Sequence, residues 1–247
     1  MNILKRTHIG TPIGEQSIRG GIDLRAATKL SGLYLVADLS MPEEKLLDAV
    51  SKAIRGGVQI LQIWNAARNL PENTLLVGKK IHSKVAEAAI PLIVNNDMEL
   101  AKRLGARGVH FDEFQTSADD ARKLLGADAI VGYTCGNDQA LVRKAEDFGA
   151  DYISFCAVFQ SPSVQSCEIV PLESVRQAKE IVSIPVFASG GITLENAHLV
   201  LEAGADGLAI ASSILRAEHP EAEARTFRQI LDKYLTGRAL SEKRSEF

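Results

Sequence analysis

From residue 33 onward the chain alternates between short apolar runs and longer amphipathic stretches. The amphipathic stretch over residues 43–55 carries Leu46, Leu47, Val50 and Ile54 at helical spacing. Strands that alternate with helices predict βαβ units and a parallel sheet. The eight apolar, β-rich runs cover residues 33–37, 58–64, 91–95, 108–111, 129–133, 152–157, 185–188 and 207–211.

Eight such units in a chain of 247 residues favour a closed barrel over an open doubly wound sheet. A dinucleotide-binding sheet is the weaker interpretation, because no Gly-x-Gly-x-x-Gly follows an early strand. We therefore predict an α/β protein with one (β/α)8 TIM barrel over residues 33–236. Residues 1–32 lack the alternation and are predicted to form an N-terminal extension, and the polar residues 237–247 to form a flexible C-terminal tail.

Two near-identical segments follow predicted helices, Gly149-Ala150-Asp151-Tyr152 and Gly204-Ala205-Asp206-Gly207. Glycine at the end of a helix adopts the left-handed conformation that turns the chain into the next strand. We interpret both segments as structural and assign them no catalytic role.

Composition and charge exclude several classes of protein. The chain has 28 Lys and Arg against 31 Asp and Glu, so no basic excess predicts binding to nucleic acid. No run approaches the roughly 18 apolar residues of a membrane span. Three cysteines in a chain of this length do not make a disulfide framework, which favours a reducing cytoplasm. The sequence leaves open whether the chain forms a homo-oligomer.

Active sites of parallel barrels gather at the carboxyl ends of the strands. The strongest candidate there is the segment from Ser189 to Thr193, in which Gly190 and Gly191 join an apolar strand to a helix. Backbone amides beside glycines and at a helix N-terminus bind anions. Because Ser212 follows the next strand, we predict a phosphate site between these two loops. The alternative is that the glycines only make a tight turn.

Acidic side chains follow two neighbouring predicted strands. Asn96 and Asp97 end the third strand, and Asp112 and Glu113 follow the fourth. Clustered oxygen ligands suit Mg²⁺, particularly beside a phosphorylated substrate. Asp97 is equally suited to capping the helix that follows it.

Two further side-chain types at the strand ends invite a functional interpretation. Trp64, the one tryptophan, is either a platform on which a planar ring stacks or a core residue. The cysteines Cys135, Cys156 and Cys167 would need a fourth ligand to bind zinc. His110, the nearest histidine, lies inside a strand and is better explained as a packed or hydrogen-bonded core residue. We therefore predict neither a zinc site nor a catalytic thiol.

Taken together, these segments resemble the family of thiamine phosphate synthases and TenI proteins over about residues 33–214. Each motif is short, but they occur in the order and at the spacing of the family. They are Leu33-Tyr34-Leu35-Val36-Ala37-Asp38, Gly56-Gly57-Val58 with Gln62, Val94-Asn95-Asn96-Asp97, Gly108-Val109-His110, Gly149-Ala150-Asp151-Tyr152, Gly190-Gly191-Ile192-Thr193 with Asn196, and Gly204-Ala205-Asp206-Gly207.

The resemblance implies a transferase that couples hydroxymethylpyrimidine pyrophosphate to thiazole phosphate, with Mg²⁺ assisting the release of pyrophosphate. It implies small phosphorylated substrates as the partners. It assigns the pyrimidine to Gln62, with Trp64 as the added stacking candidate, and pyrophosphate and Mg²⁺ to Asn96 and Asp97. The other implied substrate contacts are Thr134, which replaces a serine of the family, Ser161 and Ser163, which replace two threonines, and Gly190, Gly191, Ala211 and Ser212 around the thiazole phosphate. Asp97, Thr134 and Ser163 are the expected catalytic residues.

The chain departs from the family pattern where pyrophosphate binds. The family's Gln-Leu-Arg-x-Lys is here Gln62-Ile63-Trp64-Asn65-Ala66, and the lysine of its Thr-Pro-Thr-Lys loop is Val164. The second Mg²⁺ aspartate aligns near Gln115, so Asp112 or Glu113 is the expected substitute. Arg68, Lys79 and Lys80 are candidate replacement cations.

Two other functions stay open on the sequence alone. One is a TenI-like enzyme that acts on a phosphorylated heterocycle, although the catalytic histidine of those enzymes is Gly136 here. The other is a paralogue that binds a phosphorylated ligand without catalysis.

Overall fold

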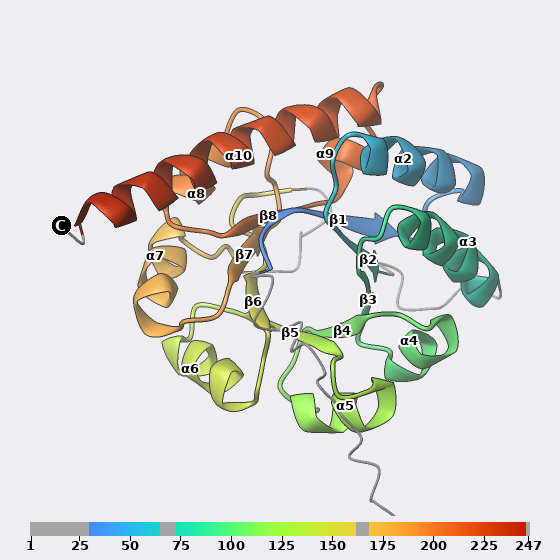
Figure 1. Cartoon of the computed structure of the whole chain (residues 1–247), viewed down its shortest axis with the longest axis horizontal. Coiled ribbons are helices and arrows are strands. Elements are labelled where there is room, and N and C mark those ends of the chain that lie inside the picture. Colours follow the sequence, from blue (N-terminus) through green and yellow to red (C-terminus); the bar gives the residue numbers. More distant parts are fainter. Residues whose placement is uncertain (1–29, 65–72, 162–167, 246–247) are drawn as a thin grey trace, which may run out of the picture.

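The computed structural model of the chain describes residues 30–64, 73–161 and 168–245. Eight parallel strands close into a barrel in chain order, and β8 (Gly207–Ile210) pairs with β1 (Gly32–Asp38). Figure 1 shows the helices as a ring around these strands. The structure therefore confirms the predicted (β/α)8 barrel.

Strands and helices alternate through the whole barrel. The other strands are β2 (Ile60–Trp64), β3 (Leu92–Asn95), β4 (Gly108–Phe111), β5 (Ile130–Cys135), β6 (Tyr152–Phe155) and β7 (Val186–Ser189). The helices are α2 (Glu43–Arg55), α3 (Thr74–Glu87), α4 (Met98–Leu104), α5 (Ala118–Leu125), α6 (Gln139–Asp147), α7 (Leu172–Ile181), α8 (Ala197–Glu202), α9 (Ser212–Leu215) and α10 (Pro220–Ser245). The apolar periodicity singles out most of these elements but does not single out α3.

The strands carry one apolar layer on each face. Leu33 and Leu35 belong to the larger layer, which lies between the strands and the helices. Tyr34 belongs to the smaller one, because successive side chains of a strand point to opposite faces. This smaller cluster fills the barrel on the amino-terminal side of Gln62. It consists of Tyr34, Ile60, Ile93, Tyr152, Phe187 and Ala209.

Two glycines make room for the large rings inside the barrel. A Cβ atom on Gly132 would lie 2.1 Å from Cζ of Tyr152, and one on Gly207 would lie 2.2 Å from Cε1 of Phe187. Neither distance is compatible with a side chain. The glycines of β5 and β8 therefore allow the aromatic rings of β6 and β7 to cross the barrel.

The two near-identical turns before β6 and β8 are built alike. The carboxylate of Asp151 accepts from the amide of Val131 and from Arg122, both at 2.8 Å. That of Asp206 accepts from the amide of Val186 at 2.9 Å and from Lys179 at 2.7 Å. Each aspartate ties its turn to the neighbouring strand at the end of the barrel away from the predicted site. The structural interpretation of these segments is confirmed.

Helix α10 runs from Pro220 to Ser245, past the point where a flexible tail is predicted to begin. Arg238 on this helix donates to the carbonyl oxygen of Gly204 at 2.8 Å and pairs with the carboxylate of Asp206. The polar residues from 237 to 245 thus continue a helix, where the sequence predicts a tail. The prediction failed because these residues have no apolar stripe of their own. They extend a helix whose earlier residues Phe227 and Leu231 pack in the core.

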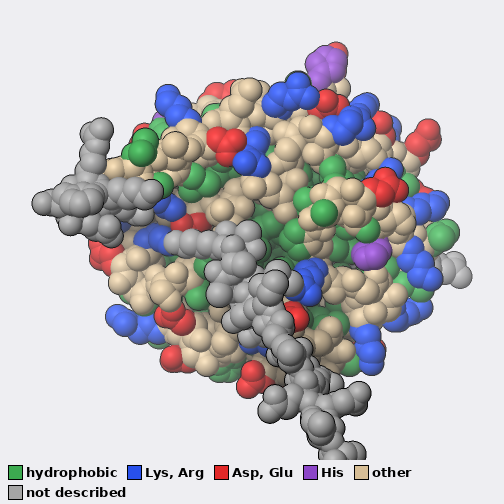
Figure 2. All heavy atoms as spheres, viewed as in Figure 1, with side chains coloured by type: hydrophobic (Ala, Val, Ile, Leu, Met, Phe, Trp, Pro, Cys, Tyr) green, Lys and Arg blue, Asp and Glu red, His purple; other side chains and the backbone are tan. Residues whose placement is uncertain are grey.

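Lys and Arg side chains are interspersed with Asp and Glu over the face shown in Figure 2. In the described part of the chain, no helix is both long enough and apolar enough to cross a membrane. Residues 1–29 of the predicted extension lie outside the described residues.

Candidate active site

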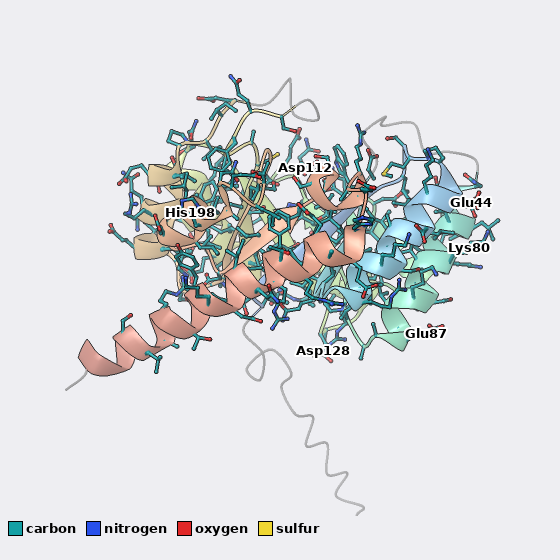
Figure 3. The ribbon with its side chains drawn as sticks, turned by 90° about the horizontal axis from the view of Figure 1, so that it is seen from above. Glu44, Lys80, Glu87, Asp112, Asp128 and His198 are labelled. Carbon is teal, nitrogen blue, oxygen red and sulfur yellow. The ribbon has the colours of Figure 1, made fainter. Side chains whose placement is uncertain are left out.

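The carboxyl ends of the strands meet at one end of the barrel. Figure 3 shows Asp112, which follows β4, at this end, and Asp128, which precedes β5, at the opposite end. The register of the parallel strands places Asn95 beside His110 and Thr134 beside Ser154. The polar side chains of these strands therefore converge above the apolar cluster that fills the lower barrel.

Gln62 of β2 lies at the centre of this polar layer and is 7% exposed. Its Nε2 donates to Oδ1 of Asn95 at 2.9 Å, and its Oε1 accepts from the hydroxyl of Tyr34 at 2.7 Å. Asn95 and Tyr34 thus fix the orientation of the Gln62 side-chain amide. The sequence predicts Gln62 as a contact for the substrate, and its position at the floor of the barrel end suits that role.

His110 of β4 is buried and hydrogen-bonded, as the sequence predicts. Its Nδ1 lies 3.0 Å from the hydroxyl of Tyr152, and its Nε2 lies 2.8 Å from Oγ1 of Thr134. Burial lowers the pKa of His110 to about 4, partly opposed by the negative charge of Asp112. At neutral pH the imidazole is therefore uncharged and holds Thr134 in place.

Tyr34 and Tyr152 belong to the same polar layer, and the sequence interpretation does not find them. Their hydroxyls lie 3.0 Å apart, and desolvation by burial is the main cause that raises the pKa of both phenols. A signal for them exists in the sequence. Each carries a hydroxyl on the barrel-facing side of its strand, and a buried hydroxyl needs a hydrogen-bond partner.

Asp97 caps helix α4, because its Oδ1 accepts from the amide of Leu100 at 2.8 Å. Asp112 accepts from Nδ2 of Asn95 at 3.0 Å and from Nδ2 of Asn96 at 2.7 Å. Glu113 accepts from the side chain of Gln115. The structure therefore brings Asn96 and Asp112 together and gives Asp97 the capping role that the sequence offers as an alternative.

The described residues contain no group of three His, Cys, Asp or Glu side chains arranged to hold a metal ion. The donors near the strand ends are nevertheless carboxylate and amide oxygens, which is the chemistry that Mg²⁺ prefers. The hydrogen bond of Asp97 uses Oδ1, and those of Asp112 use Oδ2. One oxygen of each carboxylate thus stays outside these bonds and fits a cation.

The loop after β7 is shaped by two glycines with left-handed backbone, Gly190 at φ +89° and Gly191 at φ +67°. A Cβ atom on Gly190 would lie 2.6 Å from Cα of Ala157, and one on Gly191 would lie 2.6 Å from the carbonyl oxygen of Gln160. The loops after β6 and β7 therefore press against each other, and glycine is required at both positions. The glycines do make a tight turn, as the alternative interpretation holds, and they also bring backbone to the surface of the site.

Side chains brace this loop from both sides. Asn196 accepts from the amide of Thr193 at 2.8 Å and donates to the carbonyl oxygen of Gly191 at 2.9 Å. Ser213 donates to the carbonyl oxygen of Ile192 at 2.6 Å. Helix α9 begins at Ser212, and the first amides of a helix lack partners within it. We call the loop from Gly190 to Asn196 together with the start of α9 the phosphate cup.

The remaining predicted residues are placed as follows. Trp64 ends β2 and is partly exposed, so it is not enclosed in the core. Cys135 is buried, and burial raises the pKa of its thiol to about 12, which disfavours the thiolate. Ser161 is partly buried at the edge of the loop after β6. Ser163, Val164, Cys167, Ala66 and Arg68 lie outside the described residues.

A family model described as thiamine monophosphate synthase matches residues 33–214, from β1 to α9. The chain belongs to this family. It is 37% identical over 198 residues to the thiamine-phosphate synthase of Thioalkalivibrio sulfidiphilus, a match that covers 80% of this chain and 93% of that protein. It is 36% identical over 211 residues to the thiamine-phosphate synthase of Bacillus velezensis, covering 83% of this chain and 92% of that protein.

A solved structure of a family member shares the same architecture. The thiamine phosphate pyrophosphorylase from Pyrococcus furiosus superposes with a TM-score of 0.70 at 28% identity, covering 86% of this chain and 99% of that one. The resemblance read from the sequence motifs is thus confirmed at the level of the family and of the fold.

Positive charge is scarce at the active-site end for a family named after phosphate compounds. Between each strand and the helix that follows it, Arg68 is the only Lys or Arg residue, and Arg216 comes after α9. The same strand-to-helix segments hold Glu72, Asp97, Asp112, Glu113, Asp138, Glu168 and Glu195. Lys80, a predicted replacement cation, is instead paired with Glu43 at 2.6 Å on the outer helices. Lys79 also lies on helix α3 and not in a strand-end loop, so Arg68 is the one candidate of the three in the loop after β2.

Proposed function

We propose that the chain is a thiamine phosphate synthase, a transferase that joins hydroxymethylpyrimidine pyrophosphate to thiazole phosphate in thiamine biosynthesis. The observation that carries the proposal is the pairing of a phosphate cup after β7 and β8 with a polar floor around Gln62 and Thr134. One feature receives a monophosphate, and the other can hydrogen-bond a heterocycle. Family membership supplies the reaction that uses both.

In this proposal the phosphate cup holds the thiazole phosphate. Backbone amides at Gly191 and Ser212 donate to the phosphate oxygens, with Gly190 and Ala211 shaping the backbone around them. Because amide donors are fixed by the fold, they position the thiazole without relying on a flexible side chain.

Gln62 and Thr134 bind the pyrimidine, and Trp64 stacks against a ring. The bond that breaks joins the methylene carbon of the pyrimidine to a pyrophosphate oxygen, which leaves with the electron pair. The bond that forms joins that carbon to the thiazole nitrogen. Thr134 acts by orienting the pyrimidine as this bond breaks.

Asn96, Asp97, Ser161 and Ser163 contact the pyrophosphate. Mg²⁺ would be held by Asp97, with Asp112 or Glu113, and supplies charge that stabilises the departing pyrophosphate. The support for this assignment is the oxygen-rich donor set and the oxygens that Asp97 and Asp112 keep outside their hydrogen bonds. Arg68 supplies the positive charge that Trp64, Ala66 and Val164 do not.

The alternative is a protein that binds a phosphorylated heterocycle without the transfer. The absence of the three expected cations favours it, since charge-assisted contacts stabilise a departing pyrophosphate. A TenI-like activity has less support, because Gly136 stands where the catalytic histidine is expected. The three cysteines, read as reduced, support a cytoplasmic location, and a homo-oligomer stays a prediction.

A steady-state assay with both phosphorylated substrates and Mg²⁺ tests the proposal. We expect thiamine phosphate to form, and chelation of Mg²⁺ to abolish its formation. The absence of product at high enzyme concentration would contradict the proposed synthase activity. Thermal stabilisation by thiazole phosphate alone, with no added effect of the pyrimidine pyrophosphate and Mg²⁺, would then identify the binding protein.

A further inference from the structure

Eight side chains at the carboxyl end of the barrel form one unbroken chain of hydrogen bonds. It starts with Asn96 and Asp112 in the loops after β3 and β4 and ends at the hydroxyl of Thr134 on β5. In order, the members are Asn96, Asp112, Asn95, Gln62, Tyr34, Tyr152, His110 and Thr134, with every link between 2.7 and 3.0 Å. We call this set the polar chain.

Asp112 fixes the direction of the bonds nearest the rim. A carboxylate accepts hydrogen bonds and donates none, so Asn95 must turn Nδ2 toward it. The Oδ1 of Asn95 then faces Gln62, which must donate to it through Nε2. The Oε1 of Gln62 is left facing Tyr34, whose hydroxyl therefore donates.

The direction set by Asp112 passes through both tyrosines to the histidine. The hydroxyl of Tyr34 donates its single hydrogen to Gln62, so the hydroxyl of Tyr152 must donate to Tyr34. Because the hydroxyl of Tyr152 donates its single hydrogen to Tyr34, it can only accept from His110, which must donate from Nδ1. A neutral imidazole carries one N–H, which leaves Nε2 as an acceptor for the hydroxyl of Thr134.

We propose that the polar chain holds Thr134 as a fixed hydrogen-bond acceptor toward the substrate, with Asp112 setting the direction and Tyr34, Tyr152 and His110 acting as positioning residues. The hydrogen of Thr134 is committed to His110, so only its lone pairs face a ligand. The ligand group that meets Thr134 is an N–H or O–H donor. This inference rests on the proposed function for the identity of the ligand but not for the direction of the bonds.

The centre of the polar chain is buried, whereas its Asn96 and Asp112 end is exposed. Tyr34, Tyr152 and His110 are between 1% and 4% exposed, so water does not compete for their hydrogen bonds. Reversing the direction would place an acceptor of Asn95 against the carboxylate of Asp112.

The tautomer of His110 reports the direction and is measured by long-range ¹H–¹⁵N correlation on the full chain, labelled at histidine. We expect a proton on Nδ1 and a bare Nε2 near neutral pH, with the resonance assigned by its loss in His110→Gln. We expect Asp112→Asn to give a mixture of tautomers, because an asparagine at the rim accepts either direction. A wild-type His110 protonated at Nε2 would overturn the proposal, as would an unchanged tautomer in Asp112→Asn.

A matched pair of tyrosine variants separates positioning from stability. Tyr152→Phe breaks the polar chain, whereas Tyr133→Phe removes another buried hydroxyl, which donates to the carbonyl oxygen of Thr116 at 2.6 Å outside the barrel. We expect Tyr152→Phe alone to change the tautomer and to raise the KM for the pyrimidine substrate by about five- to tenfold, the effect of one lost hydrogen bond. Equal effects in the two variants would contradict a positioning role.

If the chain proves to have no synthase activity, the tautomer measurements still decide the direction of the polar chain. A failure of the proposed function is therefore distinguishable from a failure of this inference.

Discussion

The two halves of the candidate site depend on different parts of the chain. The phosphate cup is made by backbone, with Gly190 and Gly191 allowing close approach and Asn196 and Ser213 bracing the loop. The opposite half, around Trp64 and Asp97, relies on side chains for its charge. A fold can keep a backbone site through many substitutions, but a single substitution removes a cation. The chain accordingly keeps the family pattern in the cup and departs from it across the barrel.

The largest effect is expected from Gly191→Ala. The new Cβ would lie 2.6 Å from the carbonyl oxygen of Gln160, at a φ of +67° that alanine disfavours. Left-handed backbone costs a non-glycine residue about 1–3 kcal/mol, so we expect about a hundredfold loss of affinity for thiazole phosphate. Isothermal titration measures it.

The control is Gly136→Ala, in the loop after β5, where a Cβ would meet nothing within 4 Å. This variant should bind thiazole phosphate like the wild type. Tight binding by Gly191→Ala would mean that the cup is not made by the backbone of this loop.

A smaller loss is expected from Arg68→Gln. If Arg68 is the replacement cation, its removal takes away a charge-assisted contact worth about 1.5–3 kcal/mol, so kcat should fall at least about tenfold. The affinity for thiazole phosphate should not change. Arg176→Gln, on the exposed surface of α7, is the matched control. A rate equal to that of the control would show that the opposite half does not use Arg68.

The smallest effect is expected from Ser213→Ala. This variant loses the hydrogen bond to the carbonyl oxygen of Ile192, which braces the cup without contributing an amide. One such bond is worth about 1 kcal/mol, so the KM for thiazole phosphate should rise about fivefold with little change in kcat. Steady-state kinetics at saturating pyrimidine pyrophosphate separates the two constants. A fall in kcat alone would place Ser213 outside the bracing of the cup.

The sequence predicts the barrel and the cup because both leave local signals. Alternating apolar runs mark the strands, and paired glycines after β7 mark the turn. The pairing of residues within the polar chain leaves no local signal, since Tyr34 and Tyr152 meet across 118 residues. It emerges only when the register of the strands brings inward-facing residues to one level. The role of Asp97 is undecided from sequence for a different reason, because a cap and a metal ligand both require an oxygen at that position.

The claim that the two halves differ is tested most directly by titrating the wild-type chain with thiazole phosphate and with inorganic pyrophosphate, each with and without Mg²⁺. The account predicts that thiazole phosphate binds equally well in both conditions, because amide groups alone hold its phosphate. It predicts that pyrophosphate binds only when Mg²⁺ is present, because the described loops of the opposite half carry carboxylates. Monophosphate binding that requires Mg²⁺, or pyrophosphate binding that does not, would contradict it.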